Sequence, residues 1–344
     1  MRTQSRILNL VAAVIAASVT AIASAQEPQK QSPEKPAESA QYNSPGSKEK
    51  EDGSIVCGLT IFLTTIKVSV TDGSNRPITD PGVEDFYIAE DDIKQEIAVW
   101  FHDDSSLSFS LAFDISDYEP LKLMARQTAR NFFRQIRSTD EVTIPQLKVD
   151  SQAVLGFAAD ERRLENALGE IPSNNKLIGL VAEAIKSTEK GRHPMGGAVV
   201  VITDGHSLSG TASDRAAAHA ILRQGAPIYF IILDDGHYMA RSAAQSRVRQ
   251  KRGLLTRLAA ASGGLALVVK SKDEISAATE QIIHRLKNQY TIAYYPTNVK
   301  YDGSFRYVRV TVMPKDKRKV KVFAPSGYYA PGLEKIKEEK INDK

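Results

Sequence analysis

Hydrophobic residues follow two rhythms along the chain, and the change of rhythm divides it into three parts. Between residues 53 and 104, β-branched residues alternate with polar ones, as in TIKVSV, which is typical of strands with one buried face. From about residue 105 to residue 288, short apolar runs such as AVVVIT and PIYFIIL alternate with stretches whose apolar residues recur every three or four positions. Residues 289–333 return to the alternating pattern. The pattern therefore predicts β, then α/β, then β structure.

The middle part predicts a doubly wound α/β fold with a mainly parallel sheet. Apolar strands such as SLSFSLAFD and QAVLGFA alternate with amphipathic helices, the first of which is expected over residues 119–137. Strands that are apolar on both faces belong to parallel sheets covered by helices on each side. The flanks 53–104 and 289–333 are expected to combine into one small β module.

The N-terminus has the three parts of a secretory signal peptide. Two arginines in MRTQSR precede an apolar run of 16 residues, and the small-residue triplet Ala23-Ser24-Ala25 follows it. The run is shorter than the roughly 20 residues that a membrane-spanning helix needs. We therefore expect residues 1–25 to be cleaved near Ala25, and the mature protein to be secreted or periplasmic without an integral membrane span.

The segments next to the predicted β structure are polar. Residues 26–52 contain four prolines and no Val, Ile, Leu, Phe or Met, so they cannot bury enough apolar surface to order themselves. We expect a disordered linker there and a charged tail over residues 334–344. Cys57 is the only cysteine, which excludes an internal disulfide; we expect it to act as a small apolar side chain at a strand start.

Composition and charge argue against nucleic acid as a partner. The chain of 344 residues is 42% hydrophobic and 25% charged, which is ordinary for globular protein. Its 45 basic residues fall to 43 without the two leader arginines, against 41 acidic residues, so the mature net charge is +2. Such a charge creates no field that would favour a polyanion.

Acidic residues end two of the predicted apolar strands. Asp114 follows SLSFSLAF and Asp204 follows AVVVIT, and ligands of doubly wound sheets bind beyond the carboxyl ends of strands. Two carboxylates with nearby hydroxyls such as Ser116, and with no soft ligand beside them, suit a hard cation such as Mg²⁺. The alternative is an ordinary turn, in which Ser116 or Asp117 caps a helix that starts near Glu119.

The motifs DISDY, TDG and ASGG, in this order, resemble the von Willebrand factor A domain. The resemblance extends over most of residues 58–330 to the VWFA-related (acidobacterial-type) family of exported proteins. The strings LKNQYTIAYYPTN, YDGSFRYVRVTV and SGYYAP are its most specific part.

The resemblance implies a metal-ion-dependent adhesion site that has lost part of its ligand set. Asp114 and Ser116 match the first two ligands of that site, and Asp204 matches the last. Tyr118 stands where the family has a serine, and Asn175 falls where it has a threonine. The resemblance therefore implies Mg²⁺ binding that is weak or absent, at a face formed by these five residues that binds a partner.

A serine hydrolase is the alternative. GHSLS, with Ser207 at its centre, nearly spells the nucleophile elbow G-x-S-x-G but ends in Ser209 instead of glycine. The order Ser-Asp-His would be completed by Asp234 or Asp235 with His237 or His284. The histidines otherwise show no zinc-binding spacing. One predicted helix has a basic face that we expect to be solvated, formed by Arg247, Arg249, Lys251, Arg252 and Arg257.

The combined interpretation is an exported, non-enzymatic binding or adhesion module. Its partner is expected to be a protein or a cell-envelope component, and the sequence does not indicate an oligomeric state.

Overall fold

A computed structural model of the chain describes residues 48–49, 55–56, 62–103, 108–147, 162, 166, 168–169, 176–189, 197–209, 219, 221–223, 225–236 and 242–332. The chain divides into two compact units, residues 1–61 and residues 62–344. In the first unit, β1 (Lys48–Glu49) pairs antiparallel with β2 (Ile55–Val56). The predicted signal peptide, most of the predicted linker, Cys57 and the charged tail lie outside the described residues.

The second unit contains a five-stranded parallel sheet, as predicted. Its strands, in spatial order, are β11 (Ala266–Val269), β10 (Ile228–Leu233), β9 (Ala198–Thr203), β7 (Ser108–Asp114) and β8 (Glu141–Thr143). The chain first steps outward from β7 to β8 and then returns to build β9, β10 and β11 on the other side. The strand order therefore reverses between β7 and β9, which is where doubly wound sheets bind their ligands. The predicted strand QAVLGFA lies outside the described residues.

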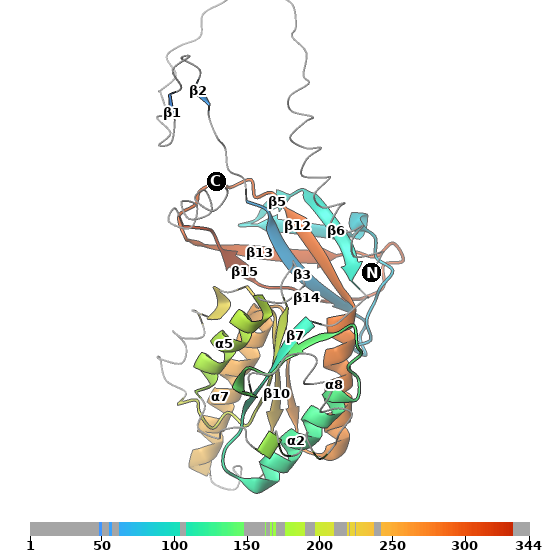
Figure 1. Ribbon diagram of the computed structural model, residues 1–344. Helices are drawn as coiled ribbons and strands as arrows, with labels where there is room; N and C mark the ends of the chain where they lie inside the picture. The colour runs from blue at the N-terminus through green and yellow to red at the C-terminus, as the bar shows by residue number, and fades with distance from the viewer. Residues whose placement is uncertain are drawn as a thin grey trace, which may run out of the picture. The chain divides into compact units, whose positions relative to one another are not determined.

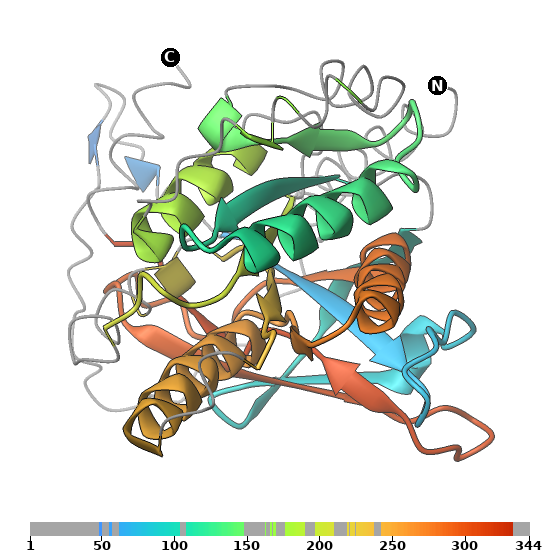
Figure 2. The same cartoon turned by 90° about the horizontal axis from the view of Figure 1, so that it is seen from below.

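Helices cover both faces of the parallel sheet (Figures 1 and 2). One face packs against α2 (Glu119–Phe133) and α8 (Lys272–Lys287), and the other against α5 (Leu177–Glu189) and α7 (Ser242–Ala261). All six side chains of β9 and of β10 are buried, which explains why these strands read as unbroken apolar runs. Helix α2 ends four residues earlier than predicted, because the chain tightens there into turns such as the Gln135 N–H to Phe132 carbonyl bond.

The remaining strands form two antiparallel sheets. One has the order β14 (Lys321–Phe323), β3 (Thr64–Thr71), β12 (Gln289–Tyr294) and β6 (Ile97–Asp103). The other has the order β15 (Gly327–Tyr329), β13 (Phe305–Val312), β4 (Phe86–Glu90) and β5 (Ile93–Gln95). Short 3₁₀ turns occupy η1 (Val83–Asp85) and η2 (Pro145–Leu147).

These two antiparallel sheets confirm the predicted β module built from both flanks. Strand β12 pairs with β3 and β6, and β13 pairs with β4, so each sheet combines segments from both ends of the second unit. The sheets share one hydrophobic core, to which β3 contributes the alternating residues Ile66, Val68 and Val70.

The β module continues directly from the α/β part. Only Asn288 separates α8 from β12. The Ser326 N–H donates to the Ala261 carbonyl at 2.9 Å, just beyond the last turn of α7. Gly263 is required at this junction, since its φ of 83° is left-handed and a Cβ there would lie 2.8 Å from the Pro325 nitrogen.

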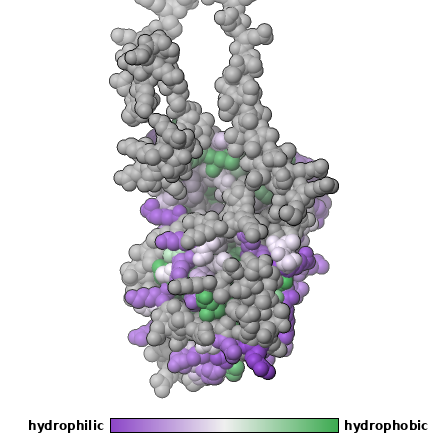
Figure 3. Space-filling model, viewed as in Figure 1, coloured by the Kyte–Doolittle hydropathy of each residue, from purple (hydrophilic) through white to green (hydrophobic). Residues whose placement is uncertain are grey.

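On the face shown in Figure 3, hydrophobic residues appear as small separate groups among hydrophilic ones. No helix among the described residues is long and apolar enough to cross a membrane.

Candidate functional site

The two predicted aspartates meet where the strand order of the parallel sheet reverses. Asp114 is the last residue of β7 and lies opposite Thr203, the last residue of β9, and Asp204 follows immediately. The Asp204 N–H donates to the Asp114 carbonyl at 3.2 Å, which holds the two strand ends together. The carboxyl edge of the sheet thus presents two neighbouring carboxylates, as the sequence predicted.

Asp114 is buried and only partly satisfied. Its side chain is 0% exposed, and its Oδ2 accepts a hydrogen bond from the Thr203 hydroxyl at 2.6 Å. The same hydroxyl accepts from the Gly205 N–H at 2.8 Å, so its own proton points to Asp114. The Asp114 Oδ1 has no hydrogen-bond partner. Burial raises the pKa of Asp114 above its ordinary value, and the Thr203 hydrogen bond opposes this.

Asp204 is fully engaged by its neighbours. Its Oδ2 accepts from the Ser116 N–H at 3.2 Å and from the Ser116 hydroxyl. Its Oδ1 accepts from the His206 N–H at 2.9 Å and lies 2.8 Å from His206 Nδ1. Burial opposes ionisation of Asp204, but the hydrogen bonds from His206 and Ser116 outweigh burial and lower its pKa. Asp204 is therefore the carboxylate that stays charged most readily.

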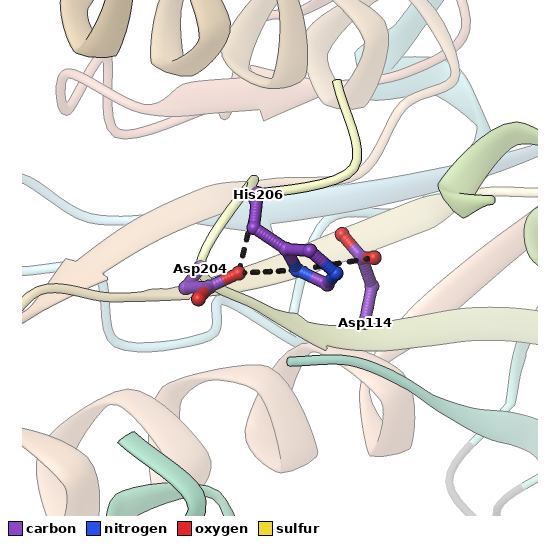
Figure 4. A group of neighbouring side chains, drawn as sticks. All are labelled: Asp114, Asp204 and His206. Carbon is purple, nitrogen blue, oxygen red and sulfur yellow. Dashed lines mark hydrogen bonds and ion pairs between the residues drawn. The ribbon is translucent and has the colours of Figure 1, made fainter. Parts of the chain in front are cut away.

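His206 completes the cluster, and the sequence interpretation did not include it. Its Nδ1 lies 3.6 Å from the Asp114 Oδ1, so the imidazole faces both carboxylates (Figure 4). Gly205 has a φ of 70°, and this left-handed conformation turns the chain so that residue 206 folds back over residue 204. The predicted ligand set of carboxylates and hydroxyls therefore lacked an imidazole nitrogen that the structure places at the site.

The three side chains fit a divalent cation. One ligand atom from each of Asp114, Asp204 and His206 lies within 4.8 Å of the others. Metal–ligand distances of about 2.0–2.2 Å place neighbouring ligands roughly 3 Å apart, and the 2.8 and 3.6 Å separations at His206 Nδ1 bracket that spacing. The Asp114 Oδ1 forms no hydrogen bond, and His206 Nδ1 lies 3.6 Å from it, so a lone pair of this oxygen is available to a cation. Imidazole favours transition metals over Mg²⁺, which prefers oxygen ligands.

The other predicted site residues have different roles. Ser116 binds Asp204 and does not cap α2, whose N-cap residue is Tyr118 without a side-chain cap. Tyr118 is half-buried and packs against the core between α2 and the sheet. Asn175 lies outside the described residues.

Among the described residues of the hydrolase alternative, Ser207 and Asp234 have other partners and His284 is remote from Ser207. The Ser207 hydroxyl accepts from the Leu177 N–H at 3.2 Å, at the start of α5. Asp234 is held by Arg252 at 2.6 Å. His284 lies in the last turn of α8, about 20 Å along the helix from the sheet edge where α8 begins. Asp235 follows β10, and His237 lies outside the described residues.

Two residues of the α7 face that was predicted to be solvated instead contact residues at the carboxyl ends of β9 and β10. Lys251 donates to the His206 carbonyl at 3.3 Å, and Arg252 is the partner of Asp234. Arg247, Arg249 and Arg257 are exposed, as predicted. Periodicity placed the polar face of α7 correctly but could not show which charged residues reach the strand ends.

No protein-family model and no curated protein matches this chain. Among solved structures, an aerotolerance-related membrane protein from Bacteroides fragilis, with multiple mutations to serines, is similar at 17% identity over 52% of this chain and 98% of its own, with a TM-score of 0.37. Proximal thread matrix protein 1 from the mussel byssus is similar at 14% identity over 53% of this chain and 49% of its own, with a TM-score of 0.35. The human COPII-coat protein Sec24c is similar at 8% identity over 65% of this chain and 44% of its own, with a TM-score of 0.31. Similarities at these TM-scores assign neither a family nor an activity.

Proposed function

We propose that this protein is an exported, non-enzymatic binding module that holds a protein or cell-envelope partner at the carboxyl edge of its parallel sheet. The observation that carries the proposal is the Asp114 Oδ1, a buried carboxylate oxygen without a hydrogen-bond partner at the point where the strand order reverses. A buried polar atom without a partner is costly, and it is retained where a ligand completes it.

The adhesion-site resemblance supports a cation at this point, with an altered preference. Asp114 and Asp204 supply negative charge, and Ser116 is committed to Asp204. His206 brings a nitrogen ligand in place of the hydroxyls that the adhesion-site pattern would supply. We therefore expect weak Mg²⁺ binding and tighter binding of Mn²⁺ or Zn²⁺.

Calorimetric titration with Mg²⁺, Mn²⁺ and Zn²⁺ tests the cation preference. The unmodified protein should bind Zn²⁺ at least ten times more tightly than Mg²⁺, and His206→Gln should remove most of this difference. His284→Gln is the matched control, because its histidine is exposed and remote from the cluster. Tight Mg²⁺ binding that survives His206→Gln would contradict the altered preference.

Charge reversal on the exposed edge tests partner binding separately. Asp117 lies in the loop between β7 and α2 with its side chain 80% exposed, so Asp117→Arg changes the edge without disturbing the core. Asp316→Arg makes the same change in an exposed turn of the β module. A partner isolated from envelope extract should bind the Asp316 variant as well as the unmodified protein and the Asp117 variant at least tenfold more weakly. Equal binding by both variants would move the partner away from this edge.

Export rests on the N-terminal leader. Intact-mass measurement should show a mature chain that begins at Gln26, and a soluble cytoplasmic protein that keeps residues 1–25 would contradict it.

A further inference from the structure

Arg285 is buried without a hydrogen-bond partner. It lies near the C-terminus of α8 and is 1% exposed, and its Nε, Nη1 and Nη2 atoms all lack a hydrogen-bond acceptor. Among the residues that the structure describes, no carboxylate forms an ion pair with it. A guanidinium stays protonated in proteins, so its positive charge is buried without an opposite charge.

The surroundings of Arg285 come from both parts of the second unit. Its guanidinium lies over the Phe323 ring of β14, 3.5 Å from the ring centroid. Phe323 and Gln289 both lie opposite Ser69 of β3, so their side chains share one face of the antiparallel sheet. Gln289 Nε2 donates to the Tyr229 hydroxyl of β10 at 3.1 Å. The cluster therefore lies where the parallel and antiparallel sheets approach each other.

Further hydrogen-bond donors of this cluster are also unused. The hydroxyls of Ser69 and Thr71 are buried without partners, and the two residues lie on the same face of β3. The Tyr229 oxygen accepts from Gln289, and the Ser69 hydroxyl lies beside the Tyr229 hydroxyl. Ser69, Thr71, Tyr229 and Gln289 are all at most 5% exposed. The cluster thus combines a cation with hydroxyl donors and lacks an anion.

An unpaired buried charge is too costly to persist alone. Isolated ions lose several kcal/mol or more on leaving water, so buried cations have an anionic partner or bound water. Burial lowers the pKa of Arg285 and raises the pKa of Tyr229. Because the raised pKa keeps the Tyr229 phenol protonated, Tyr229 does not supply the negative charge that Arg285 lacks. Native structures in which a buried group has no partner often contain an ion that completes it.

We propose that a small inorganic anion of the size of chloride binds beside Arg285, held by its guanidinium and by the hydroxyls of Ser69 and Thr71. The ligand is small and inorganic because Arg285, Ser69 and Thr71 are each at most 2% exposed, and the half-buried Phe323 ring covers the guanidinium. The anion joins α8 to β3 and β14, and so it stabilises the attachment of the β module to the parallel sheet.

Bromide replacement tests the site directly in the unmodified protein. Crystals grown in sodium bromide should show an anomalous scattering peak in contact with the Arg285 guanidinium. Ordered water in that place, with no bromide peak, would overturn the proposal.

Thermal unfolding tests whether the anion stabilises the fold. Replacing gluconate with chloride at constant ionic strength should raise the Tm saturably, by on the order of 5 °C, because a ligand that binds only the folded state stabilises it. Arg285→Met should abolish the rise, and Arg257→Met, which removes an exposed arginine, should keep it. An equal rise of the Tm in the Arg285 variant would overturn the proposal. A bromide peak without any rise of the Tm would also overturn it, because it would mark an adventitious ion only. If the Arg285 variant does not fold, the bromide experiment still decides.

Discussion

Two regions of the molecule bury a carboxylate, and they treat it differently. In the β module, Glu90 is 2% exposed and both of its oxygens are bonded. Its Oε1 accepts from Arg306 at 3.1 Å, and its Oε2 accepts from the hydroxyls of Tyr294 at 2.9 Å and Tyr328 at 2.8 Å. At the edge of the parallel sheet, Asp114 has one oxygen bonded and the other without a partner.

If the proposed function holds, this difference distinguishes a carboxylate that stabilises the fold from one that binds a ligand. The Glu90 network includes the opposite charge of Arg306, whose Nη atoms also donate to the carbonyls of Asn298 and Lys300. A network of this kind stabilises the fold and has no vacant acceptor on its carboxylate. Asp114 has one oxygen without a hydrogen-bond partner, and we expect this to lower the stability of the fold, as in sites where stability is lost in favour of binding.

Glu90→Gln should have the largest effect, because it leaves the Arg306 guanidinium buried without its opposite charge. We expect the free energy of unfolding to fall by about 3–5 kcal/mol in urea denaturation. Arg309→Met is the control, since its ion pair with Asp92 is 70% and 79% exposed and should contribute no more than about 1 kcal/mol. A loss at Glu90 as small as at Arg309 would break the comparison.

Thr203→Val should have the next largest effect. Valine keeps the shape of threonine but removes the 2.6 Å hydrogen bond to the Asp114 Oδ2, along with the acceptor of the Gly205 N–H. We expect urea denaturation to show a loss of about 2 kcal/mol. A change below about 0.5 kcal/mol would mean that another donor, such as a water molecule, replaces the Thr203 hydroxyl as the partner of Asp114.

Asp114→Asn should act in the opposite direction to Glu90→Gln. Removing a buried charge that its neighbours do not fully compensate should raise the free energy of unfolding by about 1 kcal/mol, while divalent-cation binding by calorimetry should be lost. A loss of stability comparable to that of Glu90→Gln would instead make Asp114 a structural residue.

Alkaline titration of Tyr328, a member of the Glu90 network, should give the smallest effect. Burial raises the pKa of Tyr328 to about 12, above the value near 10 of an unfolded chain. The unfolded state therefore loses this proton first, so stability is complete below pH 10 and decreases as the pH rises to 12. We expect Tyr328, which is partly exposed, to lower the free energy of unfolding by about 1 kcal/mol over this pH range. In Tyr328→Phe the decline between pH 10 and 12 should be shallower; an identical slope would contradict the assignment.

The sequence predicted the framework of the candidate site but not its full composition. Asp114 and Asp204 were predictable because each follows an apolar run, and parallel strands end at one edge. His206 was missed because the direction of its side chain depends on the left-handed turn at Gly205, which a hydrophobic pattern does not reveal. Glycine before histidine, directly after a strand-ending aspartate, was the available signal.

In the β module, too, the sequence predicted the strands but not which residues contact one another. Alternation predicted β3 and β13, because one face of each strand is apolar. It did not predict the short strand β15, or that Glu90 would meet Arg306, 216 residues further along the chain. Such contacts depend on which strands become neighbours, and periodicity carries no information about pairing.

The position of the only tryptophan makes the two regions optically distinct. Trp100 lies on β6, with its ring centroid 5.8 Å from that of Tyr290 and 6.3 Å from that of Phe86, so its fluorescence reports on the β module. The long helices α2, α5, α7 and α8 lie against the parallel sheet, so far-ultraviolet circular dichroism reports mainly on that part. Overlaying the two unfolding curves therefore shows, without any label, whether both parts melt as one cooperative unit.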